Sequence, residues 1–123
     1  MIKGTGVDIV KLERIEKIVA SKRDHFLGKL FTSTERNYII EKNFHIGTIG
    51  GMFAAKEAVS KSLGTGFLNF WPCNIEILKN ETGKPYVNLT GNALIRAQEM
   101  NIENIQISVS HTSEYAIAFC IAE

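Results

Sequence analysis

The chain is 123 residues long, with 14 Lys and Arg against 13 Asp and Glu, and its formal net charge is +1. This length suits one domain, and 45% hydrophobic residues with 2 prolines argue against a disordered, collagenous or disulfide-rich chain. No apolar run approaches the roughly 20 residues that cross a bilayer, and the first residues lack the apolar core of a secretory signal. We therefore predict a single cytoplasmic domain over residues 1–123 that contacts no membrane, with Cys73 and Cys120 as reduced thiols.

Basic residues are concentrated in the first half of the chain, where eleven Lys and Arg accompany seven Asp and Glu. They are densest between Lys11 and Lys29. Such a segment can steer an acidic or phosphorylated partner, although mixed charge is also the ordinary pattern of a solvated helix face. The mixed sign and the few aromatic residues argue against a nucleic-acid surface.

The first half of the chain is predicted to form one strand and three helices. Residues 2–9 are rich in β-branched residues and predict a strand, and apolar residues at helical spacing follow from Val10. Capping-type residues at 33–35 predict a short helix over 36–41. The polar, glycine-containing stretch 42–51 is predicted as a loop, and residues 52–63 as a helix that ends at the glycines of 64–66.

The second half is predicted to form two hairpins and one helix. Residues 74–78 and 86–89 predict strands around a turn at 81–85, and Thr90 is expected to cap the helix that follows. Residues 105–110 and 115–121 predict a second hairpin. The order β-α-α-α-β-β-α-β-β predicts an α+β fold, with a mainly antiparallel sheet and packed helices.

Two carboxylates lie where acidic side chains are unusual. Asp8 stands between β-branched residues in the first predicted strand. It can be an exposed residue, a helix cap, or a carboxylate that a cation holds in place. Glu57 lies in the most apolar helix, and Phe53 and Lys61 share its face at a spacing of four residues. If that face is exposed, Glu57 and Lys61 form an ordinary surface pair. If it is covered, Glu57 needs a partner, and a divalent metal shared with Asp8 would be one.

A group of polar residues follows the strand predicted to end at residue 110. His111 is flanked by hydroxyl residues, including Ser110 and Thr112, and such a turn could cradle a phosphate. The alternative is an exposed histidine without a role. His25 and His45 lack a comparable context and are expected to be surface residues. The glycine spacings match neither the dinucleotide-binding motif nor the P-loop.

Four segments together resemble a known family: GTGVDIVKLERI, FAAKEAVSKSLGTG, TGKPY and ISVSHTSEYAIAFCI. They are similar to the signature blocks of bacterial holo-[acyl-carrier-protein] synthases, which are 4′-phosphopantetheinyl transferases. The resemblance covers nearly the whole chain, although residues 42–51 and 67–72 match nothing in it. It implies a 4′-phosphopantetheinyl transferase-like fold. It also implies transfer of 4′-phosphopantetheine from coenzyme A to a serine of apo acyl carrier protein, in support of fatty acid biosynthesis.

The resemblance implies a role for particular residues as well. Asp8 and Glu57 would bind Mg²⁺, Lys61 would support the leaving phosphate, and the base would be Glu57 or a metal-bound water. Seven residues would bind coenzyme A: Lys61, Gly64, Lys84, Pro85, Ser110, His111 and Thr112. The basic residues that would dock the carrier protein are Arg14, Lys17, Lys22 and Arg23. Phe26 or Leu27 would add an apolar contact, and the family implies a homotrimer with sites between subunits.

Overall fold

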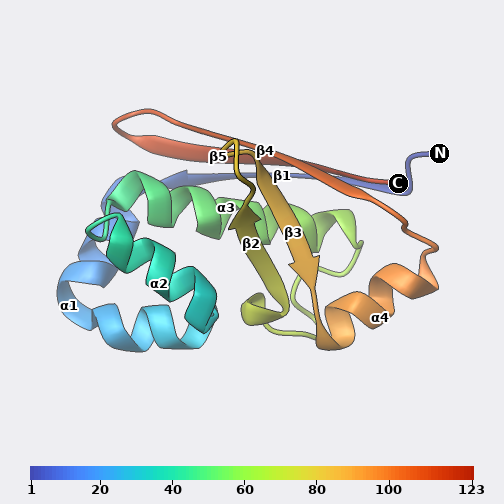
Figure 1. The fold of residues 1–123 in the computed structure, drawn as a ribbon, viewed down its shortest axis with the longest axis horizontal. Coiled ribbons are helices and arrows are strands. Elements are labelled where there is room, and N and C mark those ends of the chain that lie inside the picture. The colour runs from blue at the N-terminus through green and yellow to red at the C-terminus, as the bar shows by residue number, and fades with distance from the viewer.

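The computed structural model describes residues 1–123 and has the order of elements that the sequence predicts. The strands are β1 (Gly4–Lys11), β2 (Ile75–Lys79), β3 (Pro85–Leu89), β4 (Ile105–His111) and β5 (Tyr115–Ala122). The helices are α1 (Leu12–Leu30), α2 (Ser33–Glu41), α3 (Ile46–Ser62) and α4 (Gly91–Glu99), with a 3₁₀ turn, η1, at Pro72–Asn74. The predicted α+β class is confirmed (Figure 1). None of the helices combines the length and the apolar character of a membrane span.

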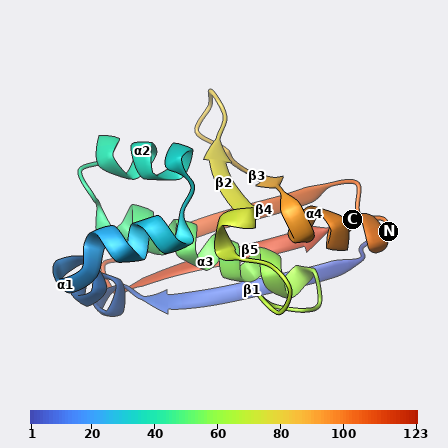
Figure 2. The same ribbon diagram turned by 90° about the horizontal axis from the view of Figure 1, so that it is seen from below.

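The five strands form two antiparallel sheets rather than one. β1, β5 and β4 make a three-stranded sheet with β5 in the centre, and β2 and β3 make a separate hairpin. In the larger sheet Asp8 is opposite Ala118, and Ala118 is opposite Val109. β1 and β4 are therefore its two edges. Figures 1 and 2 show α3 along one face of this sheet, while no helix covers the other face.

The helix α3 packs closely on the larger sheet because the residues that face it are small. β5 turns four small, buried residues toward α3: Ala116, Ala118, Cys120 and Ala122. On β1, a Cβ at Gly6 would collide with the carbonyl oxygen of Ala58, so only glycine allows this approach. The close packing holds β1 beside the second half of α3, where Glu57 and Lys61 lie.

The loop predicted over residues 42–51 is wrong in its second half, because α3 begins at Ile46. The glycines at 47, 50 and 51 suggest flexibility in the sequence, yet all three are buried in the helix. A Cβ built on Gly51, for example, would lie 3.0 Å from Cγ1 of Val109. These glycines permit close packing of the helix rather than marking a loop.

Two helix caps also differ from the prediction. The helix α2 begins three residues early, because Thr32 and Glu35 form a capping box: Thr32 Oγ1 accepts the Glu35 N–H at 3.2 Å, and the Glu35 carboxylate accepts the Thr32 N–H at 2.9 Å. Thr90 is the N-cap residue of α4, but its side chain makes no cap hydrogen bond. Its hydroxyl accepts instead from Nδ2 of Asn74 at 3.3 Å, which joins α4 to η1.

A buried ion pair joins α3 to α2 and to the smaller sheet. Lys56 Nζ lies 2.8 Å from Oε1 of Glu35, and their side chains are 1% and 0% exposed. The ammonium also donates to the carbonyl oxygens of Pro72 at 2.9 Å and Ile75 at 2.7 Å. Glu35 Oε2 accepts the N–H of Ile77 at 2.9 Å. Each charge therefore has several partners, as a buried pair requires.

Candidate active site

Asp8, Glu57 and Lys61 lie together where β1 passes α3. Along β1, Asp8 stands between two exposed residues. Because successive side chains of a strand point to opposite faces, the Asp8 side chain points toward α3. Lys61 Nζ lies 3.1 Å from Oδ1 of Asp8 and donates to the carbonyl oxygen of Val7 at 3.0 Å. Glu57 precedes Lys61 by four residues, so both side chains are on the same face of α3. Three of the predicted site residues are thus neighbours in space.

The two carboxylates of this cluster differ from surface carboxylates in their surroundings. The Asp8 side chain is 17% exposed, whereas that of Lys61 is 51% exposed. The pKa of Glu57 is raised above its usual range, first by desolvation and then by the negative charge of Asp8, while Lys61 opposes the shift. An additional positive charge beside Glu57 and Asp8 would relieve this repulsion.

The donor set of the cluster fits a magnesium ion. Mg²⁺ is commonly held by one or two carboxylates, and water and phosphate oxygens complete its ligands. Asp8 and Glu57 offer two carboxylates from two rigid elements. In this structure the positive charge beside Asp8 is the ammonium of Lys61. These two residues are the candidates to hold a divalent cation.

His111 and the neighbouring residues predicted to bind coenzyme A lie at the other edge of the larger sheet from Asp8. His111 ends β4, and two strand spacings, about 10 Å, separate the edges β1 and β4 of the sheet. Beside His111, a groove of about 260 Å³ runs between β4 and the hairpin of β2 and β3, and Pro85, Lys79 and Thr48 also line it. One copy of the chain therefore does not join His111 to Asp8 in a single pocket.

Ser110 and Thr112 are placed differently from His111. Successive side chains of a strand point to opposite faces, so that of Ser110 points to the face of the sheet that no helix covers. The hydroxyl oxygen of Thr112 accepts the backbone N–H of Glu114 at 3.2 Å and of Tyr115 at 3.1 Å, which stabilises the turn between β4 and β5. Of the three, only His111 lines the groove beside Pro85.

The two remaining residues predicted to bind coenzyme A, Gly64 and Lys84, lie in different parts of the structure. Gly64 follows α3 with a φ of 78°, and its N–H donates to the carbonyl oxygen of Lys61 at 3.0 Å. It therefore lies just after the end of the helix that carries Glu57 and Lys61. Lys84 is exposed at the hairpin turn, where its N–H donates to Oδ1 of Asn80 at 3.0 Å. It stands between Gly83 and Pro85, which line the groove at His111, but Lys84 does not line it.

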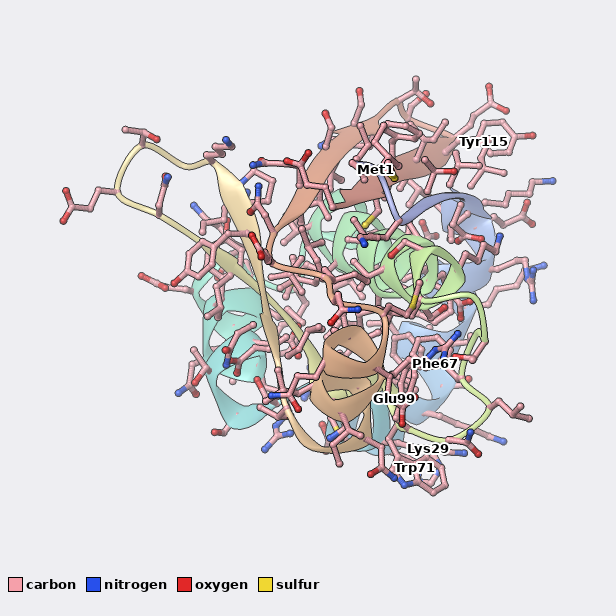
Figure 3. All side chains as sticks on the ribbon, turned by 90° about the vertical axis from the view of Figure 1, so that its right-hand side faces the viewer. Met1, Lys29, Phe67, Trp71, Glu99 and Tyr115 are labelled. Carbon is pink, nitrogen blue, oxygen red and sulfur yellow. The ribbon has the colours of Figure 1, made fainter.

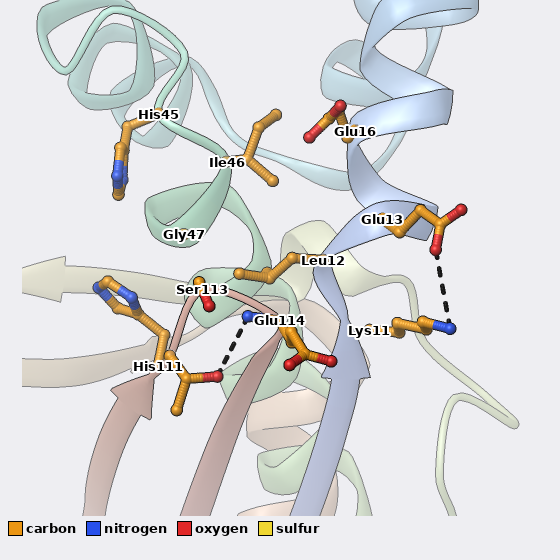
Figure 4. A pocket seen from close by; sticks show the side chains of 11 residues that line it. Lys11, Leu12, Glu13, Glu16, His45, Ile46, Gly47, His111, Ser113 and Glu114 are labelled. Atoms are coloured by element: carbon orange, nitrogen blue, oxygen red, sulfur yellow. Dashed lines mark hydrogen bonds and ion pairs between the residues drawn. The ribbon is translucent and has the colours of Figure 1, made fainter.

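A larger cleft, of about 780 Å³, lies on the other side of His111 at the start of α1. Figure 4 shows His45 and His111 on one side of this cleft and Glu13 and Glu16 of α1 on the other. The ring centroids of the two histidines are 5.8 Å apart. From the sequence alone, His45 is expected to be a surface residue. Its contact with His111 joins distant parts of the chain, and no local pattern reveals it.

The predicted docking residues lie on the exposed side of α1. Arg14 is exposed and makes no ion pair, while Lys17 is 3.1 Å from Glu13. Lys22 has a non-helical φ of −141° and marks a kink in the helix. Arg23 stacks its guanidinium over the ring of Phe44 at 4.4 Å.

The two residues expected to add an apolar contact here expose little surface. Phe26 is 8% exposed and Leu27 is 4% exposed, so both belong to the core. They follow the kink at Lys22, which turns the second half of α1 toward the core, where the Phe26 ring packs near those of Phe31 and Phe53.

Comparisons with known proteins agree with this fold. Residues 4–120 match the family model of the 4′-phosphopantetheinyl transferase superfamily. The holo-[acyl-carrier-protein] synthase of Alkaliphilus metalliredigens is 49% identical over 122 residues, which cover 99% of each chain. The crystal structure of the Neisseria meningitidis synthase has a TM-score of 0.90 at 33% identity and covers 100% of this chain and 99% of that one. The Helicobacter pylori synthase in complex with coenzyme A has a TM-score of 0.84 at 31% identity, over 97% and 99%.

The chain therefore belongs to the 4′-phosphopantetheinyl transferase superfamily. Within it, the relatives that match over the full length are holo-[acyl-carrier-protein] synthases. The resemblance stated from the sequence is confirmed.

Proposed function

We propose that this protein transfers the 4′-phosphopantetheine group of coenzyme A to a serine of apo acyl carrier protein and releases adenosine 3′,5′-bisphosphate. The observation that carries the proposal is the cluster of Asp8, Glu57 and Lys61 in a chain of this family. The reaction needs positive charge around a pyrophosphate and a group that receives the serine proton. Both requirements can be met by side chains of the cluster.

In the proposed reaction, the serine oxygen attacks the β-phosphorus of coenzyme A, and the bond from that phosphorus to the bridging oxygen breaks. Asp8 and Glu57 would hold Mg²⁺, which when bound supplies positive charge against the pyrophosphate oxygens. The ammonium of Lys61 stabilises the negative charge that grows on the departing phosphate. The Glu57 carboxylate, whose pKa is already raised by burial and by Asp8, is one candidate acceptor of the serine proton.

The coenzyme A site is proposed to form between two copies of the chain. Asp8, Glu57, Lys61 and Gly64 would come from one copy, and the partner copy would supply its groove at His111 and Pro85 together with the neighbouring Lys84. Two observations support this division: the groups lie on opposite edges of the larger sheet, and one face of that sheet has no helix over it. That face exposes five large apolar side chains, which a neighbouring copy would cover: Val7, Ile9, Tyr115, Ile117 and Phe119.

We propose the homotrimer implied by the family as this assembly. Each copy would then give one edge of its sheet to one neighbour and the other edge to the next. Sedimentation should report three chains per particle, and Phe119→Lys should dissociate it because a buried charge without a partner is costly. In a mixture of Glu57→Gln and His111→Ala chains, some sites would regain both intact halves and therefore activity. A mixture as inactive as its parts would contradict the shared site.

The carrier protein is proposed to dock on the exposed basic side of α1, which begins directly after β1. Arg14, Lys17, Lys22 and Arg23 are all exposed there. Because α1 follows the strand that carries Asp8, a partner on α1 can bring its serine to the cluster. We propose that this single domain acts in the cytoplasm, in fatty acid biosynthesis, since its substrates are coenzyme A and a carrier protein.

The test is an incubation of apo carrier protein with this protein, coenzyme A and Mg²⁺, followed by intact-mass analysis of the carrier and by the measurement of coenzyme A. A transferase adds one phosphopantetheine per carrier and consumes coenzyme A only when the carrier serine is present. A coenzyme A-binding module would leave both unchanged. A hydrolase would consume coenzyme A with a carrier whose serine is replaced by alanine.

A further inference from the structure

The imidazole of His111 makes no hydrogen bond within the protein. It lies between two cavities. The larger cleft at the start of α1 and the groove beside Pro85 are both lined by His111 and by Gly47. A side chain at such a junction has more than one orientation open to it. Its orientation must therefore come from the groups that pack against the ring.

Gly47 packs against one edge of the His111 ring. A Cβ built on Gly47 would lie 3.1 Å from both Nδ1 and Cε1 of His111, and 2.8 Å from Cε1 of His45. The absence of a side chain at Gly47 thus allows both imidazoles to approach the first turn of α3. With its Nδ1–Cε1 edge against the helix, His111 has Nε2 left to meet a ligand.

His45 is itself held in place by the helix that it caps. Its Nδ1 accepts the backbone N–H of Thr48 at 3.2 Å, so the hydrogen of this ring lies on Nε2. Its ring meets that of His111 at 61°, edge to face. A side chain fixed in this way can support its neighbour without touching the ligand.

The turn before His45 gives independent support. Asn43 and Phe44 both have a φ of 54°, a left-handed conformation that is unfavourable for a bulky residue such as Phe44. The guanidinium of Arg23 lies over the Phe44 ring at 4.4 Å and helps to hold it. Strained backbone of this kind persists where the placement of a neighbouring residue matters.

We propose that His45 and Gly47 are positioning residues for His111, and that they direct its Nε2 toward a phosphate oxygen of the bound coenzyme A. The inference rests on the proposed function and adds two residues to the site. The placement of Gly47 allows the imidazole to lie along the helix, and the His45 ring, packed edge to face against it, limits its rotation.

Gly47→Ala separates positioning from stability. Alanine favours the helix over glycine, so the melting temperature should be no lower than that of the unchanged protein. The added methyl group displaces the two imidazole rings, because these are free ends of side chains rather than backbone. The KM for coenzyme A and the dissociation constant of adenosine 3′,5′-bisphosphate should rise about tenfold, the value of one hydrogen bond to a charged group. The kcat should change much less.

The matched control is Gly28→Ala, a glycine of α1 with no atom within 4 Å of an added Cβ. It should gain the same helix propensity and leave both constants unchanged. A second variant, His45→Asn, keeps a good N-cap and removes the ring. It should weaken adenosine 3′,5′-bisphosphate binding in calorimetry, and the ¹⁵N signals of the His111 ring should shift in NMR spectra.

The result that would overturn the inference is specific to it. His111→Ala could weaken binding of adenosine 3′,5′-bisphosphate while Gly47→Ala and His45→Asn bind it like the unchanged protein. In that case the positioning role of His45 and Gly47 is wrong and the proposed function stands. If the unchanged protein does not modify a carrier protein, the proposed function fails instead. A drop in melting temperature for both variants, with binding unaffected at a temperature where they are folded, would also contradict positioning.

Discussion

Lys61 on α3 reaches Asp8 on β1, with Nζ 3.1 Å from Oδ1, and the same ammonium donates to the carbonyl oxygen of Val7. This link holds a positive charge at the edge of the larger sheet, on the face of α3 that carries Glu57. The ammonium is half exposed, so it can leave Asp8 for a phosphate when a substrate enters.

Lys61→Met should lower kcat by about 100-fold and change KM for coenzyme A much less. Methionine keeps most of the apolar stem but removes the charge, which matters most when negative charge grows on the leaving phosphate. Steady-state kinetics with saturating carrier protein measures both constants, and Lys61→Arg should retain part of the rate. An unchanged kcat would remove Lys61 from the mechanism.

Glu57→Gln should stabilise the metal-free protein at neutral pH. The pKa of Glu57 is raised by burial and by Asp8, so the folded protein holds this proton more tightly than the unfolded chain does. The contribution of Glu57 to stability is therefore full below the ordinary pKa of 4.5 and is lost as the pH rises through the raised value. The advantage of Glu57→Gln should vanish at low pH.

Thermal denaturation with EDTA, across this range of pH, measures the effect. Glu103→Gln, at an exposed position, is the control and should show no such dependence. Added Mg²⁺ should raise the melting temperature of the unchanged protein and not that of Glu57→Gln. A constant difference between Glu57→Gln and the unchanged protein at every pH would contradict the raised pKa.

Lys56→Met should lower the free energy of unfolding by about 3–5 kcal/mol, because it leaves the charge of Glu35 buried without an opposite charge beside it. The double variant Lys56→Met/Glu35→Gln should lose less than the single one. The exposed pair of Lys17 and Glu13 is the comparison, and Lys17→Met should cost less than about 1 kcal/mol. Urea denaturation tests all three. Equal losses for Lys56→Met and Lys17→Met would argue against a role for burial.

Arg14→Glu should raise the KM for the carrier protein about fivefold and leave the KM for coenzyme A unchanged. An exposed charge at the rim of an interface contributes about 1 kcal/mol and acts mainly on the rate of association. The loss of activity with added salt should also become shallower. Lys3→Glu, exposed before β1, is the control. If reversing Arg14 and Arg23 together leaves the carrier KM and its salt dependence unchanged, α1 is not the docking surface.

The strands and helices with regular patterns could be predicted from the sequence. β5 alternates small buried residues such as Ala118 with exposed ones such as Phe119, and the stripe of Leu12 and Ile15 marks the buried side of α1. The start of α3 could not be predicted, because its glycines are needed for close contacts with other elements. Gly51, for example, packs against Val109. Local propensity carries no information on such contacts.

The cluster of Asp8, Glu57 and Lys61 could be predicted in part. The spacing of Glu57 and Lys61 follows from the helix, but only the fold brings Asp8 beside them. That the groove at His111 lies at the other edge of the sheet depends on strand order, which no motif encodes. The buried pair of Lys56 and Glu35 was missed for a related reason, because a lysine in a helix is ordinarily exposed.

The measurement that tests the central claim most directly is the mass of the carrier protein after incubation with coenzyme A, Mg²⁺ and this protein, compared with Asp8→Ala and Glu57→Ala. The unchanged protein should convert every carrier to the phosphopantetheinyl form, with one adenosine 3′,5′-bisphosphate released for each. Both variants should be slower by about 100-fold or more, since a metal ion stabilises the transition state by several kcal/mol. An unmodified carrier, or a variant as fast as the unchanged protein at low Mg²⁺, would contradict the account.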